Sequence, residues 1–152
     1  MQNKLDEIIH KTHNFFAMSH LTLSVAESCT GGLICSFLTD IEGASSFFKG
    51  GIICYWTESK IDVLGVSPET ITSYGAVSSE TAVEMAEKIR QLFGTDYGVA
   101  ITGNLGPTTI EGKEKGLVYI AASRKGQTDF LQLNLTGNRM DNKIAAALSA
   151  LK

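Results

Sequence analysis

An apolar stretch at residues 21–25 runs directly into the sequence AESCTGG (residues 26–32), and this junction constrains the fold more than any other feature of the chain. The stretch alternates large apolar residues with threonine and serine, which is typical of a β-strand. The paired glycines precede a helical apolar pattern at 33–41 and predict a tight turn into a helix. Ser28 in such a turn is suited to be a nucleophile, because backbone N–H groups at a helix start can stabilise negative charge.

The rest of the chain continues to alternate strand and helix patterns. We expect helices in residues 1–20, after Pro68, from Ser78 to Gly94 and from Asn138 to Leu151, and strands at 52–56, 97–101, 117–122 and 131–135. Strands separated by helices predict an α/β fold, here a three-layer α/β/α sandwich with a mostly parallel sheet and an antiparallel edge strand. A ligand crevice should then lie beyond the carboxyl ends of the parallel strands.

Length and charge limit the classes of protein to consider. A chain of 152 residues with 43% hydrophobic content suits one domain, residues 1–152. Its 13 basic and 16 acidic residues give a net charge of −3, which does not indicate a nucleic-acid partner. No apolar run approaches the roughly 18 residues that would cross a bilayer, so we expect no membrane association and a cytoplasmic location.

The residues that usually assist a catalytic serine or bind a metal are scarce. All three histidines fall within residues 10–20, far from the expected crevice, which argues against a Ser-His-Asp triad. Neither HExxH nor CxxC occurs, so we expect no metal site. The three cysteines lie in apolar segments and are expected to be reduced and buried. Cys29 remains an alternative nucleophile, although only a helix N-terminus would lower the pKa of its thiol.

Lysine is the remaining candidate for a general base. Lys60 follows the second predicted strand, and Tyr55 lies five residues before it, so both side chains can reach the crevice that Ser28 faces. An amine acts as a base at neutral pH only if its pKa falls from about 10.4 towards 7, which requires an apolar setting or a nearby cation. The alternative is that Lys60 is an ordinary surface lysine.

Five spaced segments together resemble one known family. They are AESCTGG, FFKGGIICYWTESKIDVLGV (47–66), YGAVSSETAVEMA (74–86), ITGNLGP (101–107) and GNR (137–139). In this order, from Leu21 to the end of the chain, they closely resemble the CinA C-terminal domain family.

The resemblance implies a stand-alone nicotinamide-nucleotide amidase that converts the carboxamide of nicotinamide mononucleotide to a carboxylate and ammonia. No cofactor is implied; the expected partners are a small pyridine nucleotide and a second copy in a homodimer. By resemblance, Ser28 is the nucleophile and Lys60 its partner, with Tyr55 beside both. The residues implied to line the substrate pocket are Thr30, Gly31, Gly32, Ser46, Thr102, Gly103 and Asn104.

Two cations near the C-terminus suggest a phosphate site. Arg139 is expected in the first turn of the last helix, where a cation opposes the helix dipole unless an anion lies nearby, and Lys143 follows one turn later on the same side. We expect this pair to bind the substrate phosphate. The alternative is two solvated helix residues.

The loop at residues 104–115 departs from the family pattern. It lacks the usual glycine run and proline, Asn104 and Leu105 replace a small or apolar pair, and Lys143 stands where arginine is common. A catalytically inactive ligand-binding or interaction domain is therefore an alternative, as is the same chemistry on a different amide.

Overall fold

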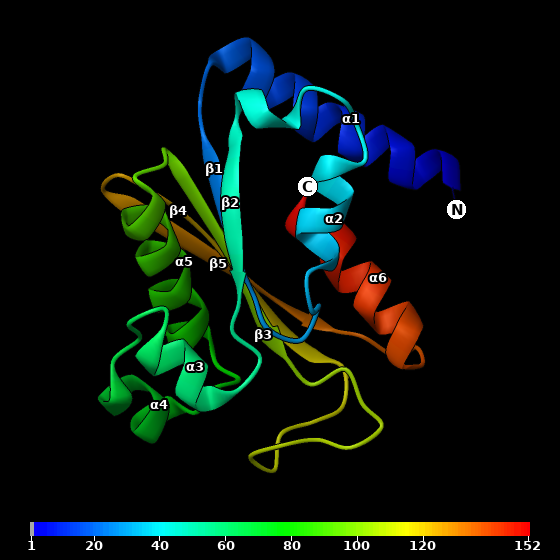
Figure 1. Ribbon diagram of the computed structural model, residues 1–152. Helices are drawn as coiled ribbons and strands as arrows, with labels where there is room; N and C mark the ends of the chain where they lie inside the picture. The colour runs from blue at the N-terminus through cyan, green and yellow to red at the C-terminus, as the bar shows by residue number, and fades with distance from the viewer. Residues whose placement is uncertain (1) are drawn as a thin grey trace.

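A five-stranded sheet in the order β2-β1-β3-β4-β5 runs through the computed structural model, which describes residues 2–152 (Figure 1). β1 pairs in parallel with β2 and β3, whereas β4 is antiparallel to both β3 and β5. The strands β1, β2, β3 and β5 therefore share one direction, and β4 runs the opposite way. The edge strand β5 is antiparallel to its neighbour β4, as predicted. The strands are β1 (Leu23–Glu27), β2 (Phe48–Ile53), β3 (Tyr97–Gly103), β4 (Leu117–Arg124) and β5 (Gln127–Asn134).

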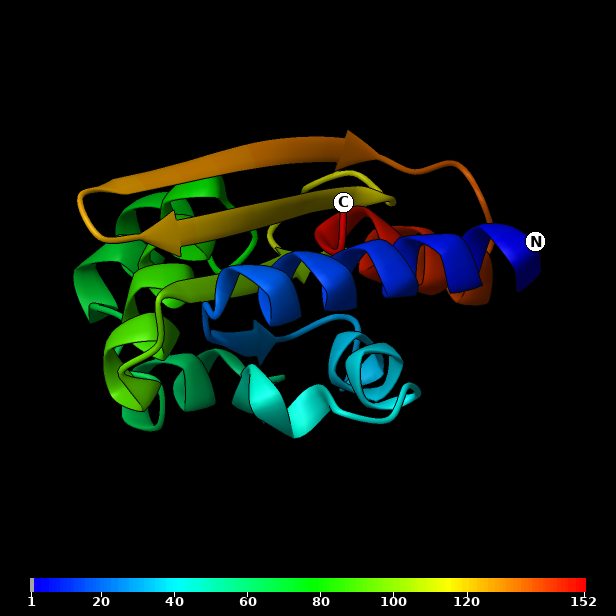
Figure 2. The ribbon, with the colours of Figure 1, turned by 90° about the horizontal axis from the view of Figure 1, so that it is seen from above.

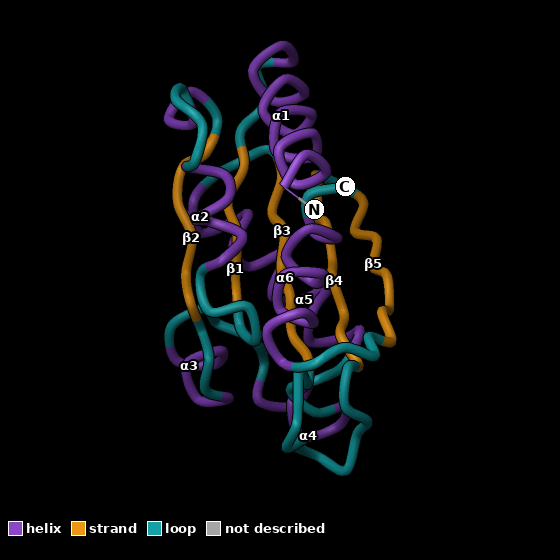
Figure 3. The backbone as a smooth tube through the Cα atoms, turned by 90° about the vertical axis from the view of Figure 1, so that its right-hand side faces the viewer, coloured by secondary structure: helices purple, strands orange, loops and turns teal. Residues whose placement is uncertain are grey.

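Helices cover both faces of the sheet, which confirms the three-layer α/β/α arrangement (Figures 1 and 3). One layer holds α1 (Gln2–Ser19), α2 (Leu33–Thr39) and α6 (Arg139–Ala150). The other holds α3 (Thr57–Asp62), α4 (Pro68–Tyr74) and α5 (Ser79–Phe93). Viewed from above, β5 lies at one edge of the sheet, and the short helix η1 (Ala44–Ser46) leads into β2 at the other (Figure 2).

The sheet separates two apolar cores because successive strand residues point to opposite faces. Leu23 and Val25 of β1 belong to the core shared with α1, α2 and α6. Ala26 faces the other way and belongs to the core built on α5. Glu27, the last residue of β1, is completely buried.

The helix boundaries follow local chemistry that the sequence displays. The Ser78 side chain accepts a hydrogen bond from the N–H of Thr81, and α5 ends at Gly94 in the left-handed conformation. The Asn138 side chain accepts from the N–H of Asp141 at the start of α6. These capping bonds satisfy donors that a helix start leaves unpaired.

The second strand lies earlier in the chain than predicted. The apolar run at 52–56 predicts a buried strand, but β2 covers Phe48–Ile53, and Trp56 caps the unpredicted helix α3. The register explains the shift, because β1 needs partners along its whole length and pairs Leu23 with Phe48 and Glu27 with Ile53. Hydrophobicity alone misplaces the strand, because the aromatic residues Tyr55 and Trp56 that follow it are exposed rather than buried.

Candidate active site

Three loops converge on one cavity beyond the carboxyl ends of the parallel strands. The cavity has a volume of about 740 Å³ and is lined by residues at or after the ends of β1, β2 and β3, by the turn between α4 and α5, and by one residue of α6. Parallel strands end at the same edge, so these loops, distant in sequence, meet there. The lining residues used below are Ser28, Cys29, Tyr55, Trp56, Glu58, Lys60, Ala76, Val77, Thr102, Gly103, Asn104, Gly106 and Arg139.

Ser28 is held at the floor of this cavity. Its N–H donates to the carbonyl of Ile101 on β3, and its own carbonyl accepts from the N–H of Gly31, which closes a tight turn. Gly31 and Gly32 have φ angles of 61° and 102°. Glycine adopts these left-handed values without steric cost, so the chain can turn from strand to helix within a few residues.

Lys60 lies against Ser28. Its Nζ is 2.9 Å from the Oγ of Ser28, and it donates to the carbonyl oxygens of Cys54 at 3.0 Å and Tyr55 at 3.4 Å. The two side chains come from α3 and from the turn after β1, 32 residues apart. Ser28 is only 6% exposed and Lys60 only 2%, so Lys60 is not a surface lysine.

Burial lowers the pKa of Lys60 because a charged amine loses its hydration there. No carboxylate forms an ion pair with it among residues 2–152. The Nζ of Lys60 has three oxygen neighbours, the hydroxyl of Ser28 and two carbonyls. A neutral amine keeps two N–H donors for the carbonyls and has a lone pair that can accept from the Ser28 hydroxyl. The lowered pKa favours this neutral form, which can remove a proton from serine.

Cys29 lines the same cavity but is not activated. Burial raises the pKa of its thiol to about 12, and the opposing influence of Lys60 is smaller. Burial also raises the pKa of Cys54, which lies at the end of β2. Because the thiolate is the nucleophilic form, these thiols are poor nucleophiles at neutral pH.

Glu27 organises the turn that follows it. Its Oε1 accepts from the Thr30 hydroxyl at 2.6 Å and from the N–H groups of Gly32 and Ile34 at 3.2 and 3.0 Å, and its Oε2 accepts from the N–H of Cys35 at 2.9 Å. A buried carboxylate at a helix N-terminus is stabilised by these donors and by the helix dipole. No pattern in the sequence displays this role of Glu27.

The first N–H groups of α2 are therefore occupied. Those of Gly32, Ile34 and Cys35 donate to Glu27, and that of Gly31 donates to Ser28. Thr30, Gly31 and Gly32 do not line the cavity. The turn N–H groups left without an acceptor within residues 2–152 are those of Cys29 and Thr30, next to Ser28.

Tyr55 and Arg139 join two walls of the cavity. The guanidinium of Arg139 donates to the Tyr55 hydroxyl at 2.8 Å and to the carbonyl of Gly106 at 2.7 Å. Lys143 does not line the cavity, but a Cβ added to Gly31 would lie 3.7 Å from its Nζ. Arg139 is thus at the cavity, and Lys143 lies beside the turn that follows Ser28.

Asn104 holds the loop at 104–115 from within. Its side-chain oxygen accepts from the N–H of Ile110 at 3.3 Å, and its side-chain nitrogen lies 3.3 and 3.5 Å from the carbonyls of Ile110 and Lys113. The amide of Asn104 is therefore used to shape the loop rather than left free for a ligand.

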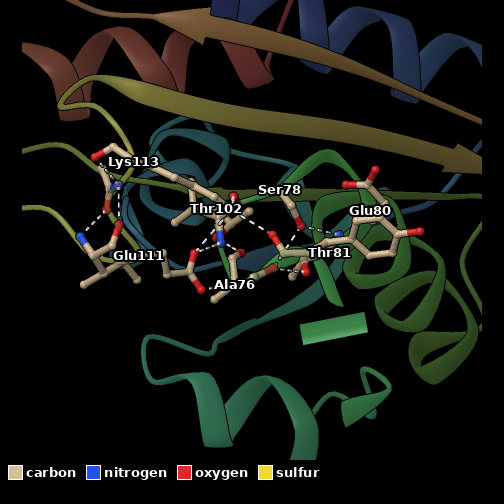
Figure 4. Close-up of polar contacts among 12 residues, drawn as sticks. Ala76, Ser78, Glu80, Thr81, Thr102, Glu111 and Lys113 are labelled. Carbon is tan, nitrogen blue, oxygen red and sulfur yellow. Dashed lines mark hydrogen bonds and ion pairs between the residues drawn. The ribbon is translucent and has the colours of Figure 1, made fainter. Parts of the chain in front are cut away.

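Glu111 and Lys113 fasten the same loop to the turn between α4 and α5 (Figure 4). The Glu111 carboxylate accepts from the N–H groups of Ala76 at 2.7 Å and Val77 at 3.0 Å, and Lys113 donates to the carbonyls of Tyr74 and Val77. Burial acts to raise the pKa of Glu111, but these N–H donors and Lys113 outweigh it, and the pKa is lowered.

The geometry of this clamp makes it a defined wall of the cavity. Gly75 has a φ of 89°, and a Cβ there would lie 2.7 Å from both carboxylate oxygens of Glu111. Thr102 completes the wall by donating its hydroxyl to the carbonyl of Ala76 at 2.8 Å. We name the contacts of Glu111 and Lys113 with residues 74–77 the loop clamp.

Replacing Glu111 by glutamine should loosen this wall. Glutamine retains one acceptor but places an NH2 group against a backbone N–H, and a hydrogen bond to a charged group is worth about 1.5–3 kcal/mol. We expect amide hydrogen exchange in residues 104–115 to become about tenfold to thirtyfold faster, measured by mass spectrometry. Glu114→Gln, an exposed change in the same loop, is the control. Equal exchange in both variants would show that the clamp does not hold the loop.

The structure brings together some of the residues singled out in the sequence and not others. Ser28, Lys60, Tyr55, Thr102, Gly103, Asn104 and Arg139 line the cavity. Thr30, Gly31 and Gly32 form the turn after Ser28 and Lys143 lies beside it, and none of the four lines the cavity. Ser46 precedes β2, whose first residue pairs with the start of β1, so it lies at the opposite end of the strands from Ser28.

The described part of the chain offers neither a metal site nor a membrane span. Within residues 2–152, no three His, Cys, Asp or Glu side chains gather as they would around a metal ion. None of the helices there is both long and apolar enough to cross a bilayer.

Two relatives of this chain are much longer proteins. A CinA-like protein from Kosmotoga olearia is 45% identical over 152 residues, which cover 99% of this chain and 36% of that protein. A CinA-like protein from Endomicrobium trichonymphae is 45% identical over 133 residues, 86% of this chain and 31% of that protein. The chain thus spans about a third of the length of these relatives.

Solved structures share the fold closely. A CinA superfamily protein from Escherichia coli matches with a TM-score of 0.93 at 30% identity, covering 97% of this chain and 86% of that one. A competence/damage inducible protein from Agrobacterium tumefaciens matches with a TM-score of 0.93 at 34% identity, covering 97% and 92%. A model of the CinA C-terminal domain matches residues 5–152. The chain belongs to the CinA C-terminal domain family.

Proposed function

We propose that this chain is an amidohydrolase that converts the carboxamide of nicotinamide mononucleotide to a carboxylate and releases ammonia. The observation that carries the proposal is the pair formed by Ser28 Oγ and Lys60 Nζ, 2.9 Å apart and buried at the floor of a cavity. A serine beside a lysine of lowered pKa is an activated nucleophile.

The reaction proceeds through an acyl-enzyme. Lys60 takes the proton of Ser28 as Oγ attacks the carboxamide carbon, and it returns that proton to the leaving nitrogen when the C–N bond breaks and ammonia departs. Water then attacks the ester carbon, again with Lys60 as base. The ester C–O bond breaks, the acid is released, and Ser28 regains its proton.

The oxyanion formed at each attack needs donors close to Ser28. The N–H group of Cys29 is suited to this role, because Cys29 lines the cavity directly after Ser28 and its N–H has no acceptor within residues 2–152. One such donor contributes about 3 kcal/mol to transition-state stabilisation. The N–H groups of Gly31 and Gly32, which the resemblance also suggests, are occupied by Ser28 and Glu27.

The cationic end of the cavity suits the phosphate of the substrate. Arg139 lines the cavity with its guanidinium fixed by Tyr55 and Gly106, and Lys143 is one turn later on α6. A guanidinium held in one orientation binds phosphate with little further loss of entropy. The proposal requires no cofactor. We also propose that the protein acts as a homodimer.

An ammonia-release assay tests the proposed function. The purified protein should release ammonia from nicotinamide mononucleotide, and Ser28→Ala should lower the rate by about 10⁴-fold or more, because the nucleophile is lost. Turnover that persists in Ser28→Ala would contradict the mechanism. Binding by calorimetry without ammonia release would favour a non-catalytic binding domain, and release from another carboxamide in a panel would indicate a different substrate.

A further inference from the structure

Trp56 is an exposed aromatic side chain at a catalytic cavity. It is the chain's single tryptophan, it is 74% exposed, and it lines the cavity that holds Ser28 and Lys60. Tryptophan gains more than most residues from burial, so an indole left in water at the edge of a cavity is a surface that a ligand can cover.

The backbone fixes the point from which this indole extends. Trp56 is the N-cap of α3, and its carbonyl accepts from the Ser59 hydroxyl at 2.7 Å and from the N–H of Lys60 at 3.3 Å. The side chain therefore starts from a rigid point one helical turn before the proposed base. Only the side-chain torsions of Trp56, and not its backbone, then have to be ordered when a ligand binds.

Trp56 is the freer of the two neighbouring rings. The hydroxyl of Tyr55 accepts from Arg139, which ties that ring to α6. No ring contact within residues 2–152 involves Trp56. The charges also differ along the cavity: Glu58, in the first turn of α3, lines it on the side of Trp56, whereas Arg139 comes from α6 on the other face of the sheet (Figure 1).

We propose that the face of Trp56 stacks on the planar cationic ring that carries the reacting carboxamide. This inference rests on the proposed function. A pyridinium ring is flat and positively charged, and the electron-rich face of an indole attracts such a ring. A substrate with a cationic ring and an anionic phosphate also matches a cavity with Trp56 and Glu58 on α3 and Arg139 on α6.

Equilibrium binding separates this role from catalysis. In Ser28→Ala, nicotinamide mononucleotide should quench the fluorescence of the single tryptophan as it binds. Calorimetry then compares Ser28→Ala with Ser28→Ala/Trp56→Phe, which keeps an aromatic face, and with Ser28→Ala/Trp56→Leu, which keeps only apolar bulk. We expect the dissociation constant to rise about twofold with phenylalanine and about fivefold to tenfold with leucine.

A matched ligand isolates the contribution of the ring. Reduced nicotinamide mononucleotide has the same phosphate and carboxamide on an uncharged, non-aromatic ring. Its dissociation constant should change less than twofold between the tryptophan and leucine forms. In the active protein, Trp56→Leu should raise KM about fivefold to tenfold and leave kcat within about twofold, because the contact binds substrate and transition state alike.

The outcomes distinguish this inference from the proposed function. Ammonia release with equal binding by the tryptophan, phenylalanine and leucine forms would overturn the stacking role and leave the amidase standing. Tighter binding by the aromatic forms without ammonia release in the Ser28 protein would overturn the amidase and support the stacking role. Absence of binding in Ser28→Ala would overturn the stacking role, and ammonia release by the Ser28 protein would decide the amidase separately. If the leucine variant did not fold, the preference of Ser28→Ala for the oxidised over the reduced ligand would decide.

Discussion

Replacing Lys60 by methionine should lower ammonia release from nicotinamide mononucleotide by about 10⁴-fold or more. Methionine fills the buried space but has no lone pair to take the proton of Ser28, so attack and ammonia departure both lose their proton carrier. Lys60→Arg should be equally inactive, because a guanidinium stays charged. Lys125→Met, at the exposed turn between β4 and β5, is the control and should keep full activity.

The pH dependence of the same variants tests the charge of Lys60. Since only the neutral amine is a base and burial lowers its pKa, kcat/KM of the unmodified protein should rise with pH through that lowered pKa and then level off. The residual rate of Lys60→Met should lack this limb. A limb of the same shape in the variant would show that another group titrates.

The lowered pKa of Lys60 should also make the stability of the folded protein depend on pH. Because the pKa of Lys60 is lower in the folded protein than in the unfolded chain, the unfolded chain binds more protons between the two values. The free energy of unfolding contributed by Lys60 therefore rises with pH across this window and levels off above the ordinary value of about 10.4. Urea unfolding should find Lys60→Met more stable at low pH, with the difference shrinking as the pH rises.

Local chemistry made part of this molecule predictable from sequence. The turn around Ser28, the side-chain caps of Ser78 and Asn138 and the apolar face of α5 depend on residues three or four positions apart. The parallel strands then place the loops after β1, β2 and β3 at one edge, whatever the details of their packing. Such features are local, or follow from the topology.

Other features depend on contacts that no local pattern displays. The six residues of α3 lack an apolar period, so the helix that carries Lys60 was not predicted. The loop clamp joins Glu111 to Ala76 and Val77, which are more than 30 residues away in the sequence. No local spacing of residues predicts such a contact. The glycines after Ser28 predict a helix start correctly. Only the structure shows that the N–H groups at this helix start already donate to the carboxylate of Glu27.

Glu27→Gln should destabilise the folded protein by about 3 kcal/mol. Three of the donors to the carboxylate can remain with the amide oxygen, but an NH2 group would then face the N–H of Cys35, and both donors would be buried without an acceptor. Such a loss includes a hydrogen bond to a charged group and the cost of unsatisfied donors. Urea unfolding measures the change, and Glu42→Gln, an exposed change just after α2, should stay within about 0.5 kcal/mol of the unmodified protein.

The same substitution should lower kcat even where the protein remains folded. Glu27 does not line the cavity, so it positions Ser28 through the turn rather than touching substrate. A shift of about 1 Å in a nucleophile costs about a hundredfold in rate, and a positioning defect of this kind should reduce kcat while KM changes little. A stable Glu27→Gln protein with unchanged kcat would mean that the tight turn of Gly31 and Gly32 alone orients Ser28, and that the buried carboxylate serves only the helix behind it.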